Sequence, residues 1–317
     1  MENVSKVASF TLTGLMEINN YKYVYFAITL VGYLLIICFN CILISIIYLN
    51  KSLHEPMYIF LCALLVNALY GTSAFYPKLL TDLLSDVHLI SYTGCLLQIF
   101  VLFTYAASEF TILTVMAYDR YVSICKPLHY HSIMTPSSVK IMLFLAWLFP
   151  VCLIGVIVIL TSRLTLCGTK LEKCYCDNWS VVKLSCVDTT VNNAVGFLVL
   201  IIVVFPPLGF IVYSYIQILK ICLRSSKEYR IKALNTCMPH LLTVVNYSIN
   251  VLFEIIISRL HTGVPQIIRI LMSVEYLVIP PLCNPIIYGL KLQEIRKRVK
   301  QMLFIRKVSP AVEIPKT

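Results

Sequence analysis

This chain contains seven apolar runs, each about 20 residues long or longer. A helix of that length crosses the ~30 Å hydrocarbon core of a bilayer. Because lipid offers no partner to an exposed backbone, only helices or closed barrels cross it. We therefore expect an all-α membrane protein, a seven-transmembrane helix bundle made of Tyr23–Tyr48, Met57–Leu84, Gly94–Tyr118, Val139–Leu160, Val191–Ile221, Leu234–Ser258 and Gln266–Leu290.

The composition agrees with a chain surrounded mainly by lipid. Of the 317 residues, 59% are hydrophobic and 13% are charged, whereas a soluble domain carries about 25% charged residues. We expect an extracellular N-terminal tail over 1–22, the bundle over 23–290 with a long second extracellular loop at 161–190, and a cytoplasmic amphipathic helix and tail over 291–317. In the last segment the apolar residues recur at helical intervals, which favours a helix lying on anionic membrane lipid. They are Ile295, Val299, Met302 and Leu303.

The distribution of charge predicts the orientation. The net charge of +11 would be compatible with a nucleic-acid partner, but 17 of the 26 Lys and Arg residues fall on one side of the predicted bundle. We therefore expect no nucleic acid, and the positive-inside bias makes that side cytoplasmic. The N-terminus is then outside and the C-terminus inside, in a multi-pass plasma-membrane protein. Asn3 begins the glycosylation sequon Asn3-Val4-Ser5 on the predicted outer side.

Cysteines gather on the same predicted outer side. Four lie in the long connection and Cys95 stands at the start of the third run. An oxidising outer face would pair these thiols. Five cysteines leave one outside any bridge, and their spacing does not decide which. The four in the connection are Cys167, Cys174, Cys176 and Cys186.

An acid and a base stand side by side at the end of the third run, Asp119 and Arg120. Arg120 follows Cys95 by roughly 37 Å of helix at 1.5 Å per residue, which places the pair at the cytoplasmic mouth of the bundle. Asp119 would hold Arg120, and a rearranged bundle would release it toward a cytoplasmic partner. The alternative is an arginine that only anchors the helix end among lipid headgroups.

Enzyme chemistry has no support in the sequence. We find no nucleotide-binding Gly-rich loop, and the six histidines show no metal-ligand spacing. We expect no enzyme and no cofactor. Asp82, Asp86 and His88 would form a weak metal or proton-sensing cluster, although solvated loop residues are the preferred interpretation. A small-solute transporter would require inverted repeats and broken helices, and the sequence shows neither.

The residues around the charge pair resemble a known family. Asp119-Arg120-Tyr121 resembles the signature of rhodopsin-like G-protein-coupled receptors, and the longer string Met116–Tyr130 resembles the odorant (olfactory) receptors. Further segments resemble the same family: Leu53–Tyr58, Lys232–Cys237 with His240, and Pro280–Gly289. Two stretches resemble its class I, fish-like branch: Tyr175–Asp177 with Val181–Cys186, and the interval from Arg259 to Pro281.

The resemblance implies signalling. An odorant would bind from outside and favour the conformation in which the sixth helix moves away from Arg120. A heterotrimeric stimulatory (olfactory-type) G protein would then enter and cyclic AMP would rise. The residues implied in coupling are Asp119, Arg120, Tyr121 and Tyr288. The implied location is the cilia of olfactory sensory neurons. The alternative is a chemosensory receptor of the same type in another tissue.

The resemblance also implies disulfides and a candidate ion site. Cys95 would pair with Cys176 and Cys167 with Cys186, which leaves Cys174 outside the two bridges. In the family an Asp pairs with an acid at the position of Glu109 around a sodium ion, whereas here the place of that Asp holds Asn67. Glu109 and Asn67 therefore form a candidate structural sodium site. The alternative is a protonated Glu109 hydrogen-bonded to Asn67 or Asn284. Tyr247-Ser248 also replaces the usual Phe-Tyr in the sixth helix.

The ligand is expected between the third, fifth, sixth and seventh helices. Arg259, at the outer end of the sixth run, carries a planar donor fork that suits a carboxylate. The hypothesis is a small, polar, carboxylate-bearing odorant, with an amino acid as its sharpest version. The alternative is an Arg259 that pairs only with headgroups or an outer-loop acid. The candidate ligand-binding residues are Phe103, Ala106, Ala107, Val251, Glu254, Ile255 and Arg259.

Overall fold

The computed structural model of the chain describes residues 7–14, 21–259 and 266–305. For residues 253–259, 266–274, 300 and 302–305 it describes the backbone alone. The sequon residue Asn3 therefore lies outside the described residues, and the side chains of Glu254, Ile255 and Arg259 lie outside the described side chains.

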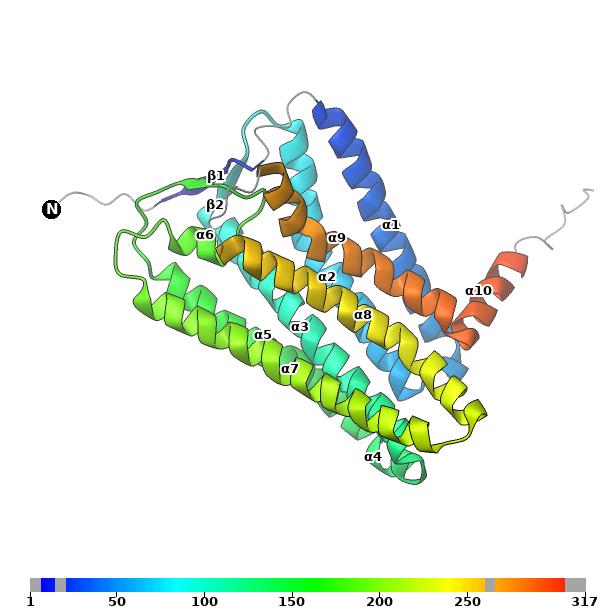
Figure 1. The fold of residues 1–317 in the computed structure, drawn as a ribbon. Coiled ribbons are helices and arrows are strands. Elements are labelled where there is room, and N and C mark those ends of the chain that lie inside the picture. The colour runs from blue at the N-terminus through cyan, green and yellow to red at the C-terminus, as the bar shows by residue number, and fades with distance from the viewer. Residues whose placement is uncertain (1–6, 15–20, 260–265, 306–317) are drawn as a thin grey trace, which may run out of the picture.

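Long helices run side by side and form one bundle (Figure 1). Five helices of the part of the chain that the structure describes are long and apolar enough to cross a membrane. These five are α1 (Lys22–Leu49), α2 (Pro56–Leu84), α3 (Tyr92–Cys125), α5 (Pro136–Ser162) and α7 (Thr190–Arg224). Two further long helices, α8 (Lys227–Arg259) and α9 (Gln266–Lys291), pack against each other. Because α8 also contacts α3 and α7, and α9 contacts α1 and α2, the two complete the bundle.

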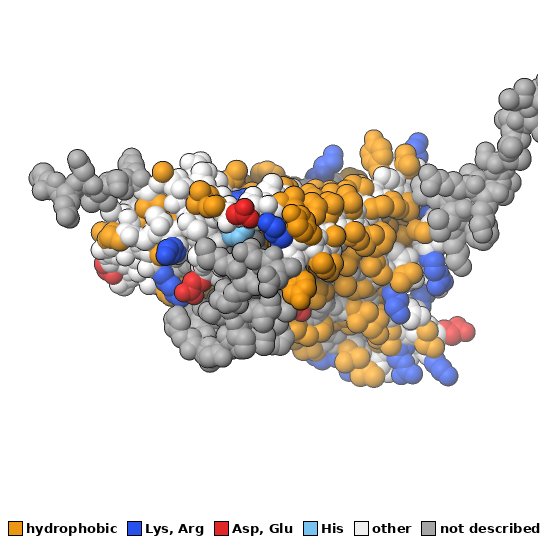
Figure 2. Space-filling model, turned by 90° about the horizontal axis from the view of Figure 1, so that it is seen from above, with side chains coloured by type: hydrophobic (Ala, Val, Ile, Leu, Met, Phe, Trp, Pro, Cys, Tyr) orange, Lys and Arg blue, Asp and Glu red, His pale blue; other side chains and the backbone are white. Residues whose placement is uncertain are grey.

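The outer surface of the bundle is apolar, as expected of helices that face lipid. Large exposed side chains on it include Phe144, Phe197 and Phe205. Figure 2 shows a broad hydrophobic region over the helices, with Lys and Arg side chains gathered toward the end at which α10 (Gln293–Ile305) lies. A soluble domain would bury such side chains, so this surface favours a membrane environment.

Helix α3 occupies the centre of the bundle, where it contacts α2, α5, α7 and α8. Its buried face combines apolar residues with polar ones such as Gln98 and Glu109. A close approach between α2 and α3 depends on Gly71, because a Cβ there would lie 2.3 Å from Cγ of Tyr105. The buried polar residues of α3 therefore face neighbouring helices rather than lipid, which is where such groups find partners.

A small sheet covers one end of the bundle. Strand β1 (Ser9–Leu12) pairs antiparallel with β2 (Leu89–Ser91) and parallel with β3 (Lys170–Leu171). Phe10 and Leu12 are fully buried and pack in one cluster with Cys95 and Cys176. Residues 1–22 are expected to form a tail, so strand β1 is a feature that the sequence does not predict. The short helix α6 (Asn178–Val182) lies at the same end of the bundle (Figure 1).

Two helix ends differ from the expected spans. The third helix continues to Cys125 rather than ending at Tyr118, and the sixth begins at Lys227 rather than Leu234. Short helices follow the third one, a 3-10 turn at Pro127–His129 and α4 (Tyr130–Ile133), and another 3-10 turn at Lys51–Leu53 joins α1 to α2. The other long helices begin and end within three residues of the expected positions.

Candidate functional site

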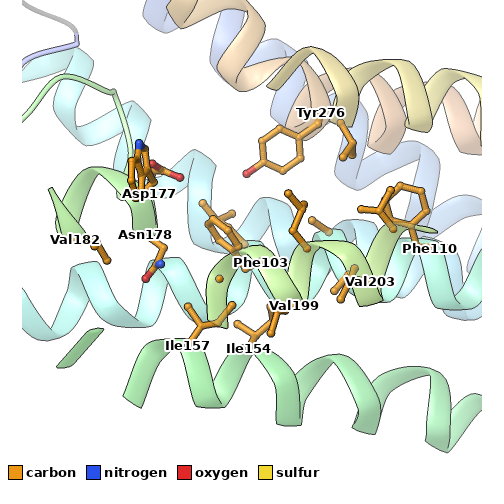
Figure 3. Close-up of a pocket in the computed structure, with 18 of the residues that line it drawn as sticks. Phe103, Phe110, Ile154, Ile157, Asp177, Asn178, Val182, Val199, Val203 and Tyr276 are labelled. Atoms are coloured by element: carbon orange, nitrogen blue, oxygen red, sulfur yellow. The ribbon is translucent and has the colours of Figure 1, made fainter. Parts of the chain in front are cut away.

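A cavity of about 190 Å³ lies within the bundle near the sheet-covered end. Its lining comes from α3, α5, α6, α7, α8 and α9. In Figure 3, Asp177 and Asn178 lie at one end of the cavity and Phe110 at the other. Ile154, Ile157 and Val199 lie along one side between the two ends (Figure 3). The cavity is therefore polar at its loop end and apolar toward the middle of the bundle.

Four of the candidate ligand residues line this cavity: Phe103, Ala106, Ala107 and Val251. Their contact with an odorant stays a prediction. Residues of the long loop between Tyr175 and Val182 also line the cavity, a contribution that is not predicted from the sequence. The sequence does contain an indication of this contribution. A disulfide from Cys95, at the start of the third helix, to Cys176 would hold the residues after Cys176 over the helix ends. The first turn of α7, where Asn192 and Asn193 line the cavity, is also not predicted from the sequence.

The polar end is held in place by loop contacts. Asp177 caps α6, because its Oδ2 accepts hydrogen bonds from the backbone N–H and the hydroxyl of Ser180, both at 3.0 Å. Lys173 Nζ lies 3.8 Å from the same oxygen. Thr161, at the end of α5, donates a hydrogen bond of 2.7 Å to Oδ1 of Asn178. These contacts fix α6 against α5.

Two disulfides fix the loop over the cavity. Cys95 is bonded to Cys176 and Cys167 to Cys186, the pairings that the resemblance implies. Gln98 strengthens the first attachment: its amide oxygen accepts a 2.8 Å hydrogen bond from the N–H of Cys176, and its nitrogen donates one of 2.9 Å to the carbonyl of Ala74 on α2. The loop, α2 and α3 are thereby joined at one point.

A buried polar cluster lies at the centre of the bundle. Oε2 of Glu109 accepts a 2.8 Å hydrogen bond from Nδ2 of Asn67, and Oε1 accepts one of 2.9 Å from Nδ2 of Asn284. All three residues are fully or almost fully buried. The amide oxygens of Asn67 and Asn284 have no hydrogen-bond partner among the described residues. These oxygens are ligands suited to a hard cation, although the amides present nitrogen rather than oxygen to Glu109. The residue types therefore fit a sodium ion only if both amides turn.

Hydrogen bonds tie α8 to α3 between the cavity and the opposite end. The hydroxyl of Tyr247, a cavity-lining residue, donates a 2.7 Å hydrogen bond to the carbonyl of Ala106. Further along, Nε2 of His240 lies 2.9 Å from the carbonyl of Leu113, and Nδ1 lies 2.7 Å from the hydroxyl of Tyr215 on α7. Since a carbonyl accepts, Nε2 is the donor and Nδ1 accepts from the tyrosine. A movement of α8 away from α3 would break both links.

The charge pair lies at the end of the bundle opposite the sheet. Arg120 is ion-paired with Oδ2 of Asp119, and both residues are buried. The hydroxyl of Tyr130, on α4, donates a 2.8 Å hydrogen bond to Oδ1 of Asp119. Burial and the adjacent Asp119 raise the pKa of the Tyr130 hydroxyl, so it remains a donor at neutral pH. The pair is thus part of a packed network, and the headgroup-anchored alternative does not describe it. Tyr121 is half-buried beside it, and Tyr288 of α9 is buried.

The interpretation of Asp82, Asp86 and His88 as solvated loop residues is wrong in part. Asp82 belongs to α2, is 2% exposed and pairs with Lys78, because a residue one turn earlier on the helix reaches its carboxylate. His88 is also buried, and its carbonyl accepts a hydrogen bond from β1. Asp86 alone is exposed, and it pairs with Lys22. In the part of the chain that the structure describes, no group of three His, Cys, Asp or Glu residues is placed to hold a metal ion.

A bundle of apolar helices with a cavity near one end and a buried Asp–Arg pair at the other is the arrangement of a membrane receptor of the G-protein-coupled class. Comparison with known proteins gives the family. The olfactory receptor family model matches residues 28–306. Human (Homo sapiens) olfactory receptor 52K1 is 37% identical over 278 residues, which cover 87% of this chain and 88% of that protein.

Other relatives agree. Human olfactory receptor 2AT4 is 36% identical over 280 residues, covering 88% of this chain and 87% of the relative. Olfactory receptor 1 of the rat, Rattus norvegicus, is 34% identical over 309 residues, covering 96% of this chain and 98% of the relative. The chain belongs to the olfactory receptor family, and the recognition made from its motifs is confirmed. It is a membrane protein of a receptor family rather than an enzyme.

Proposed function

We propose that this receptor binds a small odorant in the cavity near the sheet and, in response, activates a stimulatory G protein that raises cyclic AMP. The observation that carries the proposal is the pairing of an outer cavity with the buried Asp119–Arg120 pair at the opposite end of the same helix, α3. The proposal includes seven membrane crossings with the N-terminus outside and the C-terminus inside, an orientation in which the cavity would face the odorant and Arg120 would face the G protein.

The mechanism is a ligand-shifted equilibrium between two conformations. In the described conformation Arg120 is held by Asp119, and α8 is tied to α3 through Tyr247 and His240. An odorant that binds better when α8 has moved would favour the opened conformation. Arg120, Tyr121 and Tyr288 would then face a cytoplasmic opening that admits the G protein. Family membership supports coupling to a G protein in general, and the stimulatory type is part of the proposal.

Substitution of Arg120 tests this function. We expect Arg120→Ala to abolish odorant-evoked cyclic AMP while surface expression stays within about twofold of wild type. Arg163→Ala is the matched control, because it removes an exposed arginine at the other end of the bundle. Cyclic AMP and surface labelling would be measured in the same cells. Normal odorant responses from Arg120→Ala at normal surface expression would reject the coupling role.

The carboxylate-bearing odorant stays a prediction that rests on Arg259. A charge-assisted bidentate contact contributes roughly 1.5–3 kcal/mol. Arg259→Ala should therefore weaken responses to acids by about ten- to a hundredfold and leave matched esters nearly unchanged. An equal loss for an acid and its ester would assign Arg259 a structural role. The ligand roles of Glu254 and Ile255 rest on the same proposal.

Further parts of the proposal concern the branch of the family, the tissue of expression and the contact with membrane lipid. The class I assignment and the location in cilia of olfactory sensory neurons stay predictions, with a chemosensory role in another tissue as the alternative. Helix α10 carries basic residues after α9, and Arg298 lies 3.3 Å from the hydroxyl of Ser52 in the first inner connection. This contact holds α10 against the bundle, where its basic side chains would meet anionic lipid. Transcript localisation would decide between the tissues.

A further inference from the structure

The polar end of the cavity contains hydrogen-bonding groups that the described protein does not use. Asn192 and Asn193, in the first turn of α7, both line the cavity. Nδ2 of Asn192 and Oδ1 of Asn193 are buried, and neither has a hydrogen-bond partner among the described residues. Nδ2 of Asn193 donates to the hydroxyl of Thr189 at 3.3 Å, which leaves its oxygen as the unused atom. The amide pair, Asn192 and Asn193, therefore offers one donor and one acceptor.

Unused buried groups of this kind favour a ligand. A buried donor or acceptor without a partner is costly, whereas a ligand that supplies the missing partner recovers that cost on binding. Sites built to hydrogen-bond a ligand also reject analogues that lack the complementary group. The amide pair thus defines what the polar part of the ligand must carry: an acceptor for Asn192 and a donor for Asn193.

The charge at this end favours a neutral ligand group. Among the described lining residues, Asp177 is the one that carries a formal charge, and it is negative. Ser180 donates to its carboxylate, and Lys173 Nζ, 3.8 Å from the same oxygen, offsets part of the negative charge without lining the cavity. An anionic ligand group at the amide pair would share the polar end of the cavity with this carboxylate and be repelled by it. A neutral group avoids that repulsion.

The rest of the cavity determines the size of the ligand and the apolar character of its other end. The walls beyond the polar end are formed by apolar side chains such as Phe103, Val199 and Val203. A dry apolar cavity of roughly 150 Å³ holds a benzene molecule. The cavity of about 190 Å³ therefore suits a molecule slightly larger than benzene. Its apolar part would point away from α6, toward Phe110.

We propose that the amide pair selects odorants with a neutral polar end that carries both a carbonyl acceptor and an N–H or O–H donor, such as a primary amide or a hydroxy ketone, on a short apolar chain. The inference rests on the proposed function and specifies the ligand of the same cavity. It competes with the carboxylate hypothesis, which depends on a side chain outside the described ones.

Binding of four probes of equal size tests the proposal: hexanamide, methyl pentyl ketone, octane and hexanoate. The readout is the ligand-induced shift in thermal unfolding of the purified full-length receptor, titrated to give affinities, because this measurement needs no G protein. We expect hexanamide to bind most tightly. Asn192→Leu should weaken hexanamide and the ketone about tenfold, the effect of one lost hydrogen bond. Asn193→Leu should weaken hexanamide about tenfold and leave the ketone, which has no donor, unchanged.

Val199→Ala is the matched control, since it removes apolar contacts from the cavity wall on the same helix and should weaken all bound probes to a similar degree. Where a leucine variant does not fold, the alanine variant at the same position gives the same comparison. The proposal is overturned if both asparagine variants weaken octane as much as hexanamide, if hexanoate binds more tightly than hexanamide, or if no probe binds. Selective binding without any cyclic AMP response would reject the proposed function alone.

Discussion

At the scale of single residues, Asn67 determines how much charge the centre of the bundle contains. Its amide donates a 2.8 Å hydrogen bond to Glu109 but adds no negative charge. We predict that Asn67→Asp strengthens sodium binding, because a second carboxylate attracts the cation and supplies hard oxygen ligands. Sodium at about ten times its dissociation constant would stabilise the variant by about 1.4 kcal/mol. Thermal unfolding in sodium chloride and in choline chloride at equal ionic strength measures the difference.

The control for this prediction is Glu109→Gln, which should remove the sodium response of the wild type and lower that of Asn67→Asp to about the wild-type level, because one carboxylate remains there. If sodium stabilises the wild type as much as Asn67→Asp, then Asn67 is as good a ligand as aspartate and the charge argument is wrong. The hydrogen bonds of the cluster, rather than its charge, would then determine sodium binding.

The sequence allows functional interpretation of a residue where its type is rare in its surroundings. Glu109 and Arg120 are charged residues in or beside apolar runs, so the sequence by itself indicates that each has a partner. Asn192 and Asn193 give no such signal. Amides are ordinary near a helix start, and only the placement of α6 and the long loop encloses them in a cavity. Tyr247 is visible as a departure from the family pattern, but its hydrogen bond to Ala106 depends on how α8 packs against α3.

At the scale of elements, the two disulfides attach the long loop with unequal strength. The Cys95–Cys176 bridge spans 81 residues of sequence and Cys167–Cys186 spans 19. Loop-closure entropy then gives about 4.5 kcal/mol for the first bridge and about 3.2 kcal/mol for the second. We predict that replacing both cysteines of the first bridge with alanine lowers stability more than the same change in the second. Chemical denaturation measures both, and non-reducing peptide mapping checks the pairings.

Cys174→Ala is the control for the disulfide prediction, because it should leave both bridges intact in the peptide map. Equal losses from the two double variants would mean that contacts of the loop, rather than chain entropy, determine its contribution. Finding Cys174 bonded to Cys95 would contradict the pairing itself.

The link between α8 and α3 through Tyr247 gives a second prediction at this scale. Tyr247→Phe removes the 2.7 Å hydrogen bond to Ala106 and keeps the ring that packs edge-on against Phe110. A hydrogen bond contributes about 1 kcal/mol, so the equilibrium should shift about fivefold toward the opened conformation. Ligand-independent cyclic AMP should rise accordingly. Thr236→Val is the control, since the hydroxyl of Thr236 donates its hydrogen bond to the carbonyl of Lys232 within α8 itself. A fall in basal signalling would show that the bond stabilises the active conformation.

Helix ends show where prediction from apolar runs reaches its limit. The third run predicts an end at Tyr118 because charges follow it, yet α3 continues to Cys125. Asp119 and Arg120 compensate each other, and Tyr130 satisfies the remaining carboxylate oxygen, so the helix continues through buried charges. The sixth helix begins seven residues before the expected position. Its first turns are largely exposed and carry Lys and Arg side chains, so they do not belong to an apolar run. Strand β1 is not predicted, because its two alternating apolar residues, Phe10 and Leu12, are too few to indicate a strand.

At the scale of the whole molecule, cavity and charge pair can act as receptor and coupling site only if they face opposite sides of the membrane. The asymmetry of charge predicts which side is cytoplasmic: 17 of the 26 Lys and Arg residues belong to the connections and tail predicted to be inside. Near the first helix the bias is weak, with Lys22 on the outer side and Lys51 on the inner. The orientation therefore depends on the later connections, including the basic segment of α10.

The prediction is that an N-terminal epitope is labelled on intact cells and a C-terminal epitope only after permeabilisation. Asn3 should carry a glycan in this orientation, because its sequon would then face the lumen during synthesis. Asn3→Gln should reduce a glycosidase-sensitive mobility shift, and Asn3→Gln combined with Asn178→Gln, which removes the second outward sequon Asn178-Trp179-Ser180, should abolish it; Asn235→Gln, which alters an amide on the predicted inner side, should retain it. Labelling of the C-terminal epitope on intact cells would reverse the orientation. It would also place Arg120 outside, where no G protein could reach it, and so reject the proposed mechanism as a whole.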